Sequence, residues 1–280
     1  MFEMIRGELT KLRKRKMTWI LLAVMVVYYG LIFFAIYSIA NNPPHRMEEQ
    51  VVAQIKASIQ FPGAFDTIFS SAGDIGVLLL IILVASSIGN EYGWGSIRQV
   101  LLRRGIRSQF VLSKVISFVI VAIIGLVLAV LTGFIITIIT SNLLGTIDWG
   151  FLTGSFALEQ LEAYGWTLFA LLPFIMLATF FAFWGRSAIT GIGGALGFYI
   201  IEAIVVGIFS QSEGWLGEVP PYLIGPNVDA LIPASMFDQM PFAGGVEDIT
   251  TLHAAITLSV YCVVLLVASL VMFKKRDIVV

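Results

Sequence analysis

Residues able to carry out chemistry are few in this 280-residue sequence. It has two histidines, His45 and His253, and one cysteine, Cys262, so a zinc or iron–sulfur cluster is not expected. It contains neither a GxxxxGK(S/T) phosphate loop nor an HExxH motif, and an intramembrane aspartyl protease would need a second aspartate beside Asp74. We therefore expect no catalytic residue, no metal and no cofactor on this chain, which is then not an enzyme by itself.

Two acids, Asp74 and Glu202, interrupt otherwise apolar stretches, where a charge costs at least about 2.5 kcal/mol. A helical rise of 1.5 Å per residue places each of them about 22–24 Å from the same membrane side, so they share a depth. No Lys or Arg inside the stretches can neutralise them, so each must be protonated, hydrogen-bonded or facing a water-filled cavity. We interpret them as lining a substrate path or its gate, with a structural hydrogen bond as the alternative for each.

Six long apolar stretches must hold these acids in place. Hydrophobic residues make up 58% of the chain and charged residues 12%, against about 25% charged in soluble domains. The stretches cover 17–40, 66–90, 114–141, 165–185, 188–210 and 253–273. Each is near or above the roughly 20 residues that cross a hydrocarbon core, and each is apolar on every side, unlike the alternating strand of a barrel. The sequence predicts an all-α polytopic membrane protein with six transmembrane helices in one domain, residues 1–280.

The basic residues are confined to one side of this arrangement. All of the 17 Lys and Arg except Arg46 and Lys56 lie in alternate gaps between the stretches. Short basic segments are retained in the cytosol during membrane insertion, so both termini are expected to be cytosolic. We expect a multi-pass protein of a bacterial cell membrane, in contact with the lipid bilayer and with no nucleic acid partner.

The N-terminal residues 1–16 have the pattern of an amphipathic helix. Phe2, Ile5, Leu9 and Leu12 recur at helical spacing. The basic residues that follow are Lys11, Arg13, Lys14, Arg15 and Lys16. Such a helix lies in the membrane interface. It docks a partner or serves only as a topology anchor attracted to anionic headgroups.

The inside segment 91–113 is longer than a turn between two helices requires. After the flexible Gly93-Trp94-Gly95, apolar and basic residues recur at helical spacing: Ile97, Arg98, Val100, Leu101, Arg103 and Arg104. A short amphipathic helix here can transmit motion from a soluble partner. The alternative is a solvated basic loop that only obeys the topology rule.

Glycine and proline mark the other irregular places. The outside segment 211–252 holds five of the nine prolines, which predicts a folded-back, partly interfacial loop and no continuous helix. The first outside gap has Val52, Ile55 and Ile59 at helical spacing and predicts a short amphipathic helix.

Gly193 and Gly197 form a GxxxG pair, which predicts a helix-packing seam or a contact between two chains. Pro173 lacks the amide that would bond to Phe169 and predicts a kink.

Three segments together resemble the permease subunit of type-2 ATP-binding-cassette exporters. They are ELTKLRKRKMTWI at 8–20, EYGWGSIRQVLLRRGIRSQFVLSK at 91–114 and FKKRDI at 273–278. The resemblance implies a substrate path formed by two permeases, identical or related, and a separate cytosolic ATPase in two copies that holds ATP and Mg. It also implies that residues 1–16 are an elbow helix and that the segment from Glu91 to Arg104 is the coupling helix. The coupling residues are then Glu91, Ile97, Arg98, Leu101, Arg103 and Arg104.

Two other classes of function remain open at this point. A channel would need a ring of polar pore-lining groups, which Asp74 and Glu202 could form only in an oligomer. A membrane assembly or sensor subunit with no transport of its own would need only the topology and the basic surfaces. The substrate of an exporter does not follow from the sequence.

Overall fold

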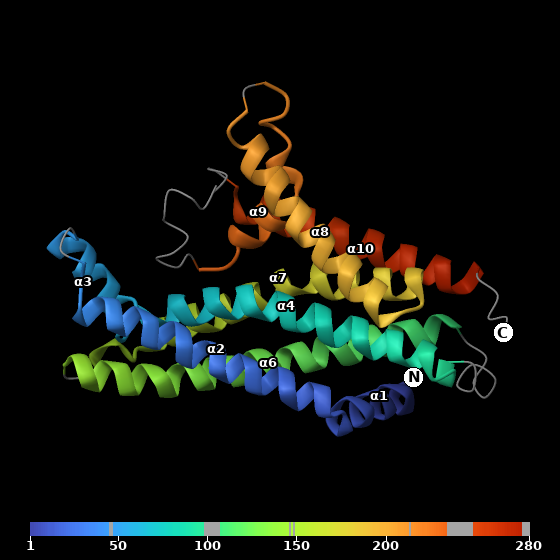
Figure 1. Ribbon diagram of the computed structural model, residues 1–280, viewed down its shortest axis with the longest axis horizontal. Helices are drawn as coiled ribbons and strands as arrows, with labels where there is room; N and C mark the ends of the chain where they lie inside the picture. Colours follow the sequence, from blue (N-terminus) through green and yellow to red (C-terminus); the bar gives the residue numbers. More distant parts are fainter. Residues whose placement is uncertain are drawn as a thin grey trace.

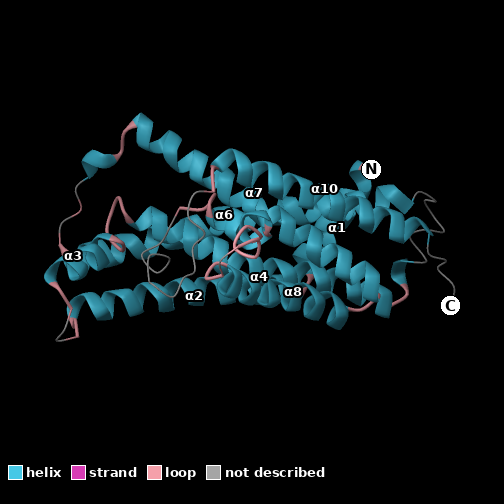
Figure 2. Cartoon of the chain, turned by 90° about the horizontal axis from the view of Figure 1, so that it is seen from above, coloured by secondary structure: helices cyan, strands magenta, loops and turns pink. Residues whose placement is uncertain are grey.

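The structure is a computed structural model and describes residues 1–44, 47–97, 107–145, 147, 149–212, 214–233 and 249–275. Within these ranges it consists of helices joined by loops and turns, without a strand (Figure 2). Six helices are long and apolar enough to cross a membrane: α2 (Lys16–Asn41), α4 (Ala64–Gly93), α6 (Arg107–Leu144), α7 (Gly154–Gly185), α8 (Ala188–Phe209) and α10 (Thr251–Lys275). The prediction of an all-α protein with six candidate membrane spans is confirmed.

Two of these helices begin well before the predicted stretches. α6 begins at Arg107 and not at residue 114, and α7 begins at Gly154 and not at residue 165. The added turns of α7 contain Glu159 and Glu162, so a search for apolar residues misses them although the helix is continuous. Thr153 caps this start, since its hydroxyl accepts a hydrogen bond from the amide of Phe156 at 3.3 Å.

Five shorter elements complete the described chain. They are α1 (Phe2–Lys14), α3 (Glu49–Ala57), the 3₁₀ turns η1 (Trp149–Phe151) and η2 (Pro220–Tyr222), and α9 (Ile224–Asp229). α1 is separated from α2 by Arg15, which has an extended backbone, and it lies at an angle to α2 (Figure 1). Both ends of the described chain lie at the same end of the helix bundle (Figure 1). α3 is the short helix predicted for the first outside gap, and its Ile55 is buried.

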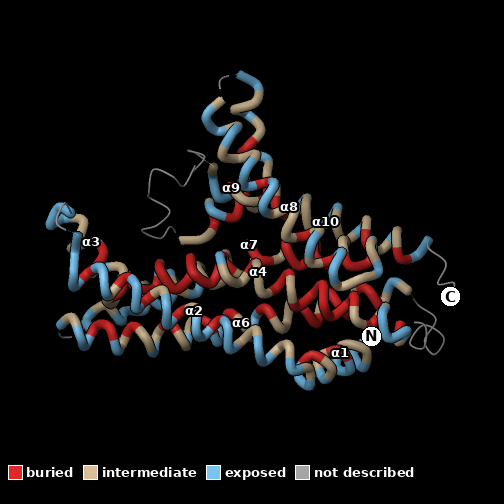
Figure 3. The backbone as a smooth tube through the Cα atoms, in the orientation of Figure 1, coloured by how far each residue is buried: buried red, intermediate tan, exposed pale blue. Residues whose placement is uncertain are grey.

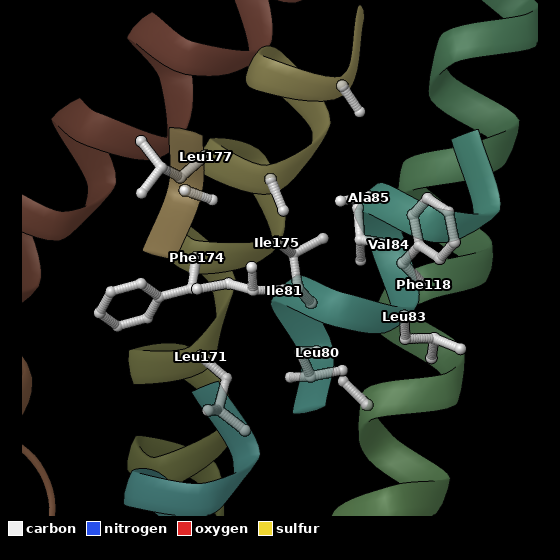
Figure 4. Packing of buried hydrophobic residues seen from close by; sticks show 14 of the residues in the cluster. Leu80, Ile81, Leu83, Val84, Ala85, Phe118, Leu171, Phe174, Ile175 and Leu177 are labelled. Atoms are coloured by element: carbon white, nitrogen blue, oxygen red, sulfur yellow. The ribbon is translucent and has the colours of Figure 1, made fainter. Parts of the chain in front are cut away.

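The core of the bundle is built around α4 and α7 (Figure 3). Leu80, Ile81 and Val84 of α4 meet Phe174 and Ile175 of α7, and all are buried (Figure 4). Gly89 allows α4 to approach the start of α8 closely, since a Cβ added there would lie 2.0 Å from the backbone nitrogen of Ala188. By contrast, α8 and α10 bury little of their surface within the chain (Figure 3).

The proline-rich segment 211–252 is not one continuous helix in its described part. It forms η2 and α9, which lie between α8 and α10 in the chain, and α9 packs against α10 (Figure 1). Residues 234–248 lie outside the described residues. Pro173 is buried inside α7.

Candidate functional site

Five charged residues meet at the end of the bundle that holds α1. Glu8 and Lys11 come from α1, Arg15 from the break after α1, Glu91 from the last turn of α4, and Lys114 from α6. We call these residues the charge cluster. Two carboxylates thus face three cations at the place where three chain segments come together (Figure 1).

Lys114 is the centre of the charge cluster. Its side chain is 0% exposed, and its Nζ lies 2.8 Å from Glu8 Oε2 and 2.8 Å from Glu91 Oε2. The contact with Glu8 is a hydrogen bond, whereas the contact with Glu91 is an ion pair without hydrogen-bond alignment. A buried ammonium is tolerated only where anions of this kind surround it.

The two other cations close the outer side of the charge cluster. Lys11 Nζ lies 2.7 Å from Glu8 Oε1 and 3.3 Å from Glu91 Oε1, while the Arg15 guanidinium lies 3.7 Å from Glu91 Oε1. Arg15 also lies over the ring of Trp94 at 5.4 Å, a cation–π distance. Each carboxylate is therefore shared between cations from different segments.

Local sequence explains why these side chains reach one another. Glu8 and Lys11 are three residues apart on one face of α1, and Leu12 of the same face is buried in the core. Glu91 lies near the C-terminus of α4, and Lys114 lies two turns into α6. The apolar face of α1 docks on the bundle, and this docking brings its acid to the buried lysine.

The charges of the cluster shift the pKa of Glu8 and the pKa of Lys11. Burial acts to raise the pKa of Glu8, but the ammonium groups of Lys114 and Lys11 outweigh it and hold this pKa below its ordinary value. Partial burial acts to lower the pKa of Lys11, but the carboxylates of Glu8 and Glu91 outweigh it and raise this pKa. Both groups stay charged near neutral pH.

The charge cluster connects the two helices on either side of the segment between α4 and α6. Glu91 and Lys114 flank this segment in sequence and meet in space, and both contact Lys11 or Glu8 of α1. A further tie lies close by, since Arg107 Nη1 donates a hydrogen bond to the carbonyl oxygen of Lys274 at 2.8 Å. The start of α6 is thus linked to α1, α4 and the end of α10.

Comparison with protein families gives one result. Residues 51–279 match the family described as protein of unknown function DUF2705. The chain belongs to this family. The match includes Glu91 and Lys114 but begins after α1, so Glu8 lies outside it. A search of curated proteins gave no match to this DUF2705 member.

Two of the predicted coupling residues are described, and both lie inside the protein. Glu91 is 2% exposed within the charge cluster, and Ile97 is 2% exposed within the apolar core. Four others, Arg98, Leu101, Arg103 and Arg104, lie outside the described residues. In the DUF2705 chain, Glu91 and Ile97 therefore anchor the start of the segment between α4 and α6 by packing inside the bundle.

The predicted interfacial cations of α1 divide into two sets. Lys11 and Arg15 belong to the charge cluster, while Arg13, Lys14 and Lys16 are exposed. Neither Glu8 nor Lys114 was predicted as a site residue. Glu8 is an acid three residues before a lysine in a basic helix, and Lys114 is a lysine at the edge of an apolar stretch.

Glu202 of α8 is buried and binds the start of α9. Its Oε1 accepts hydrogen bonds from the backbone amides of Ile224 and, at 3.3 Å, Gly225. Its Oε2 has no hydrogen-bond partner among the described residues. Asp74 lies on α4 and is exposed in the single chain, so the two acids predicted as a pair have different surroundings.

Three further residues, not foreseen from the sequence, fix α9. Asn227 is fully buried, and its Nδ2 donates to the carbonyl oxygens of Pro221 and Leu223 at 2.7 and 2.6 Å. His253 Nε2 lies 2.9 Å from the carbonyl oxygen of Pro221, and the Tyr261 hydroxyl donates to that of Tyr222 at 3.0 Å. The bonds of Asn227 tie α9 to η2 and to the residue between them, and the bonds of His253 and Tyr261 attach η2 to α10.

The GxxxG pair makes no packing seam among the described residues of this chain. A Cβ added at Gly193 or Gly197 would meet nothing within 4 Å, whereas one at Gly191 or Gly194 would meet Ala182 or Phe181 at under 3 Å. The register of close packing is therefore shifted from the predicted pair to its neighbours, and the contact with a second chain stays a prediction. No cluster of three or more metal-binding side chains occurs in the part of the chain that the structure describes.

Proposed function

We propose that this DUF2705 protein is the membrane-spanning subunit of an ATP-driven exporter of the type-2 ATP-binding-cassette class. Two such subunits form the substrate path, and a separate cytosolic ATPase in two copies binds ATP and Mg. The proposal rests on the resemblance of three segments to this class and on six helices of membrane-spanning length.

The orientation in this proposal follows from the distribution of charge. α1, the facing ends of α4 and α6, and the end of α10 lie at one end of the bundle (Figure 1). The same end carries most of the basic residues, so in this proposal it faces the cytosol. Both termini and the coupling segment then face the ATPase.

The charge cluster supports the coupling step of the proposal. Residues 98–104 are the proposed contact with the ATPase, and they are connected to the bundle through Glu91 on one side and Lys114 on the other. Glu8 and Lys11 join both of these residues to α1. A displacement of the coupling segment would therefore be passed to α4, α6 and the elbow helix together, shifting the population of the accessible states.

The proposed substrate path lies between the two permeases. α8 has open space beside Gly193 and Gly197 and buries little of its length, which makes it a candidate contact with the second chain. In this proposal Glu202 positions α9 beside the path, and Asp74 faces the path or the partner permease.

Affinity purification in a mild detergent tests the proposal. The full chain, tagged at its C-terminus in its native cell, should retain a nucleotide-binding subunit, and the purified complex should hydrolyse ATP. A chain that purifies without such a subunit and carries ion current in a planar bilayer would be a channel. A chain that does neither would be an assembly or sensor subunit.

A further inference from the structure

An apolar cavity of about 390 Å³ lies between α1, α2, α4 and α6. Its volume falls within the range of about 300–1,000 Å³ that is usual for ligand pockets. Nearly all its lining side chains are apolar, and the polar ones, Arg13 and Thr18, lie at the turn from α1 into α2. The cavity belongs to neither the charge cluster nor the surroundings of Glu202.

The cavity is elongated along the helices. On α4 its lining forms one stripe of residues three and four apart, from Ala72 to Leu83, which spans about 16 Å. On α6 the lining runs from Ile120 to Ala129. A long, narrow, apolar space parallel to membrane-spanning helices has the shape of a hydrocarbon chain.

One side of the cavity reaches the surface of the bundle. Two of its lining residues on α6, Ile124 and Leu128, are 52% and 37% exposed. Both belong to a helix of membrane-spanning length, so this opening faces hydrocarbon and not water. A flexible chain can therefore enter from the side.

The end of the cavity near α1 carries positive charge and an aromatic ring. Thr18 and Trp19 have internal acceptors, because the Thr18 hydroxyl donates to Leu12 O at 2.7 Å and Trp19 Nε1 to Arg13 O at 2.9 Å. The exposed guanidinium of Arg13 has no ion-pair partner among the described residues. Tryptophan and arginine are the residues that anchor proteins at the headgroup level of a bilayer.

We infer that this cavity binds one acyl chain of an anionic phospholipid, whose phosphate headgroup lies against Arg13. An apolar interior of hydrocarbon shape, a lateral opening and a guanidinium without an ion-pair partner among the described residues together match an anionic lipid. A zwitterionic phospholipid also carries a phosphate, but its ammonium group offsets the attraction to the guanidinium, so the anionic lipid is favoured. The inference is independent of the proposed export function, since it requires only the single chain in a bilayer.

Filling the cavity tests the inference. A Cβ added at Gly125, which lines the cavity on α6, would meet nothing within 4 Å, so Gly125→Leu places a side chain in the space without a clash at its Cβ. Gly30 of α2 also has open space but does not line the cavity, so Gly30→Leu is the matched control. Leu79→Phe fills the same space from α4. With two filled variants on different helices, a folding defect in one of them leaves the other to test lipid binding.

The measurement is native mass spectrometry of the chain released from nanodiscs of equal phosphatidylglycerol and phosphatidylcholine. We expect the parent chain and Gly30→Leu to retain one phosphatidylglycerol, and Gly125→Leu and Leu79→Phe to lose it. Arg13→Gln should lower the preference for phosphatidylglycerol about fivefold.

Three results would overturn the inference. They are equal lipid retention in the filled and control variants, no headgroup preference in the parent chain, or a lipid-free dimer that only the filled variants disrupt. The last result would show that a second copy of the chain occupies the cavity.

Discussion

Lys114 is the residue on which the described end of the bundle depends most. It is fully buried between Glu8 and Glu91, which belong to different helices, so it compensates two buried carboxylates at once. Removing one partner of a buried ion pair leaves an uncompensated charge, which costs about 3–5 kcal/mol.

Lys114→Met should therefore lower the free energy of unfolding by about 3–5 kcal/mol, because Glu8 and Glu91 would lose the one fully buried cation of the charge cluster and keep only the more exposed Lys11 and Arg15. Denaturant-induced unfolding in detergent micelles, followed by tryptophan fluorescence, measures this change. Lys14→Met is the control, since Lys14 is exposed on α1 and its loss should change stability by less than about 0.5 kcal/mol. Equal stabilities of the two variants would show that the charge cluster does not hold α1 to the bundle.

The contribution of Glu8 should depend on pH in a defined direction. Its pKa in the folded protein is lowered from 4.5, so its stabilising effect is complete above that value and is lost as pH falls through the folded pKa. The pKa of Lys11 is raised from 10.5, so its effect is complete below that value and is lost as pH rises through the folded pKa. The difference in melting temperature between the parent chain and Glu8→Gln should be constant between about pH 5 and 10 and shrink below pH 4.5. A difference that grows on acidification has the wrong sign for this account.

At the scale of elements, α9 is too short to be stable alone and depends on its attachments. It has six residues, and the carboxylate of Glu202 accepts hydrogen bonds from two amides at its start. Isolated helices need about 12–15 residues to form in water, so packing and capping must hold this one.

Glu202→Leu should release α9, because the buried amide of Ile224 and the partly buried amide of Gly225 would lose their acceptor at a cost of about 1–3 kcal/mol. Glu202→Gln keeps a carbonyl oxygen at the same place and should retain α9. Hydrogen exchange of residues 220–229, read by mass spectrometry, should be faster in the leucine variant alone. Loss of transport in a glutamine variant with normal exchange would instead favour a direct role of the carboxyl group in the substrate path.

The helices could be predicted from the sequence to different degrees. The apolar stretches were sufficient to predict six candidate spans, because burial in lipid or core requires apolar residues at every turn. The helical spacing of Val52, Ile55 and Ile59 predicted α3. The starts of α6 and α7 could not be predicted this way, since Arg107–Ser113 and Gly154–Tyr164 contain polar residues within a continuous helix. Backbone hydrogen bonds, and for α7 the Thr153 cap, stabilise these added turns whether or not their side chains are apolar.

The charge cluster was beyond prediction from one sequence. Glu8 and Lys114 are separated by 106 positions, and nothing in either local pattern indicates that α1 docks beside α6. Of the members of the charge cluster, Lys11 and Arg15 were predicted as interfacial cations of an amphipathic helix, and Glu91 was predicted from the resemblance to the exporter class. A structural hydrogen bond was one of the two alternatives predicted for Glu202. The partner in that bond, the start of α9, could not be predicted from the sequence, because its position depends on how residues 211–233 fold back.

At the scale of the whole molecule, the proposed orientation predicts which residues are accessible from outside the cell. In a Cys262→Ser background, Glu49→Cys should react with a membrane-impermeant maleimide on intact cells, because α3 lies at the end of the bundle away from α1 (Figure 1). Lys14→Cys should react only after the membrane is permeabilised. The reverse pattern would invert the topology and move the proposed coupling segment away from the cytosol.

The central proposal is that a separate ATPase acts on this chain through the segment between α4 and α6. The rate of ATP hydrolysis by the purified complex in vesicles tests it most directly, with charge reversal at Arg103 and Arg104 as the perturbation. Lys274→Glu with Lys275→Glu is the control, since it makes the same change in net charge at the end of α10. We predict a rate about tenfold or more lower for Arg103→Glu with Arg104→Glu, normal membrane insertion for both double variants, and a near-parental rate for the control. Equal hydrolysis rates in the two double variants, or a chain with which no ATPase activity purifies, would contradict the proposal.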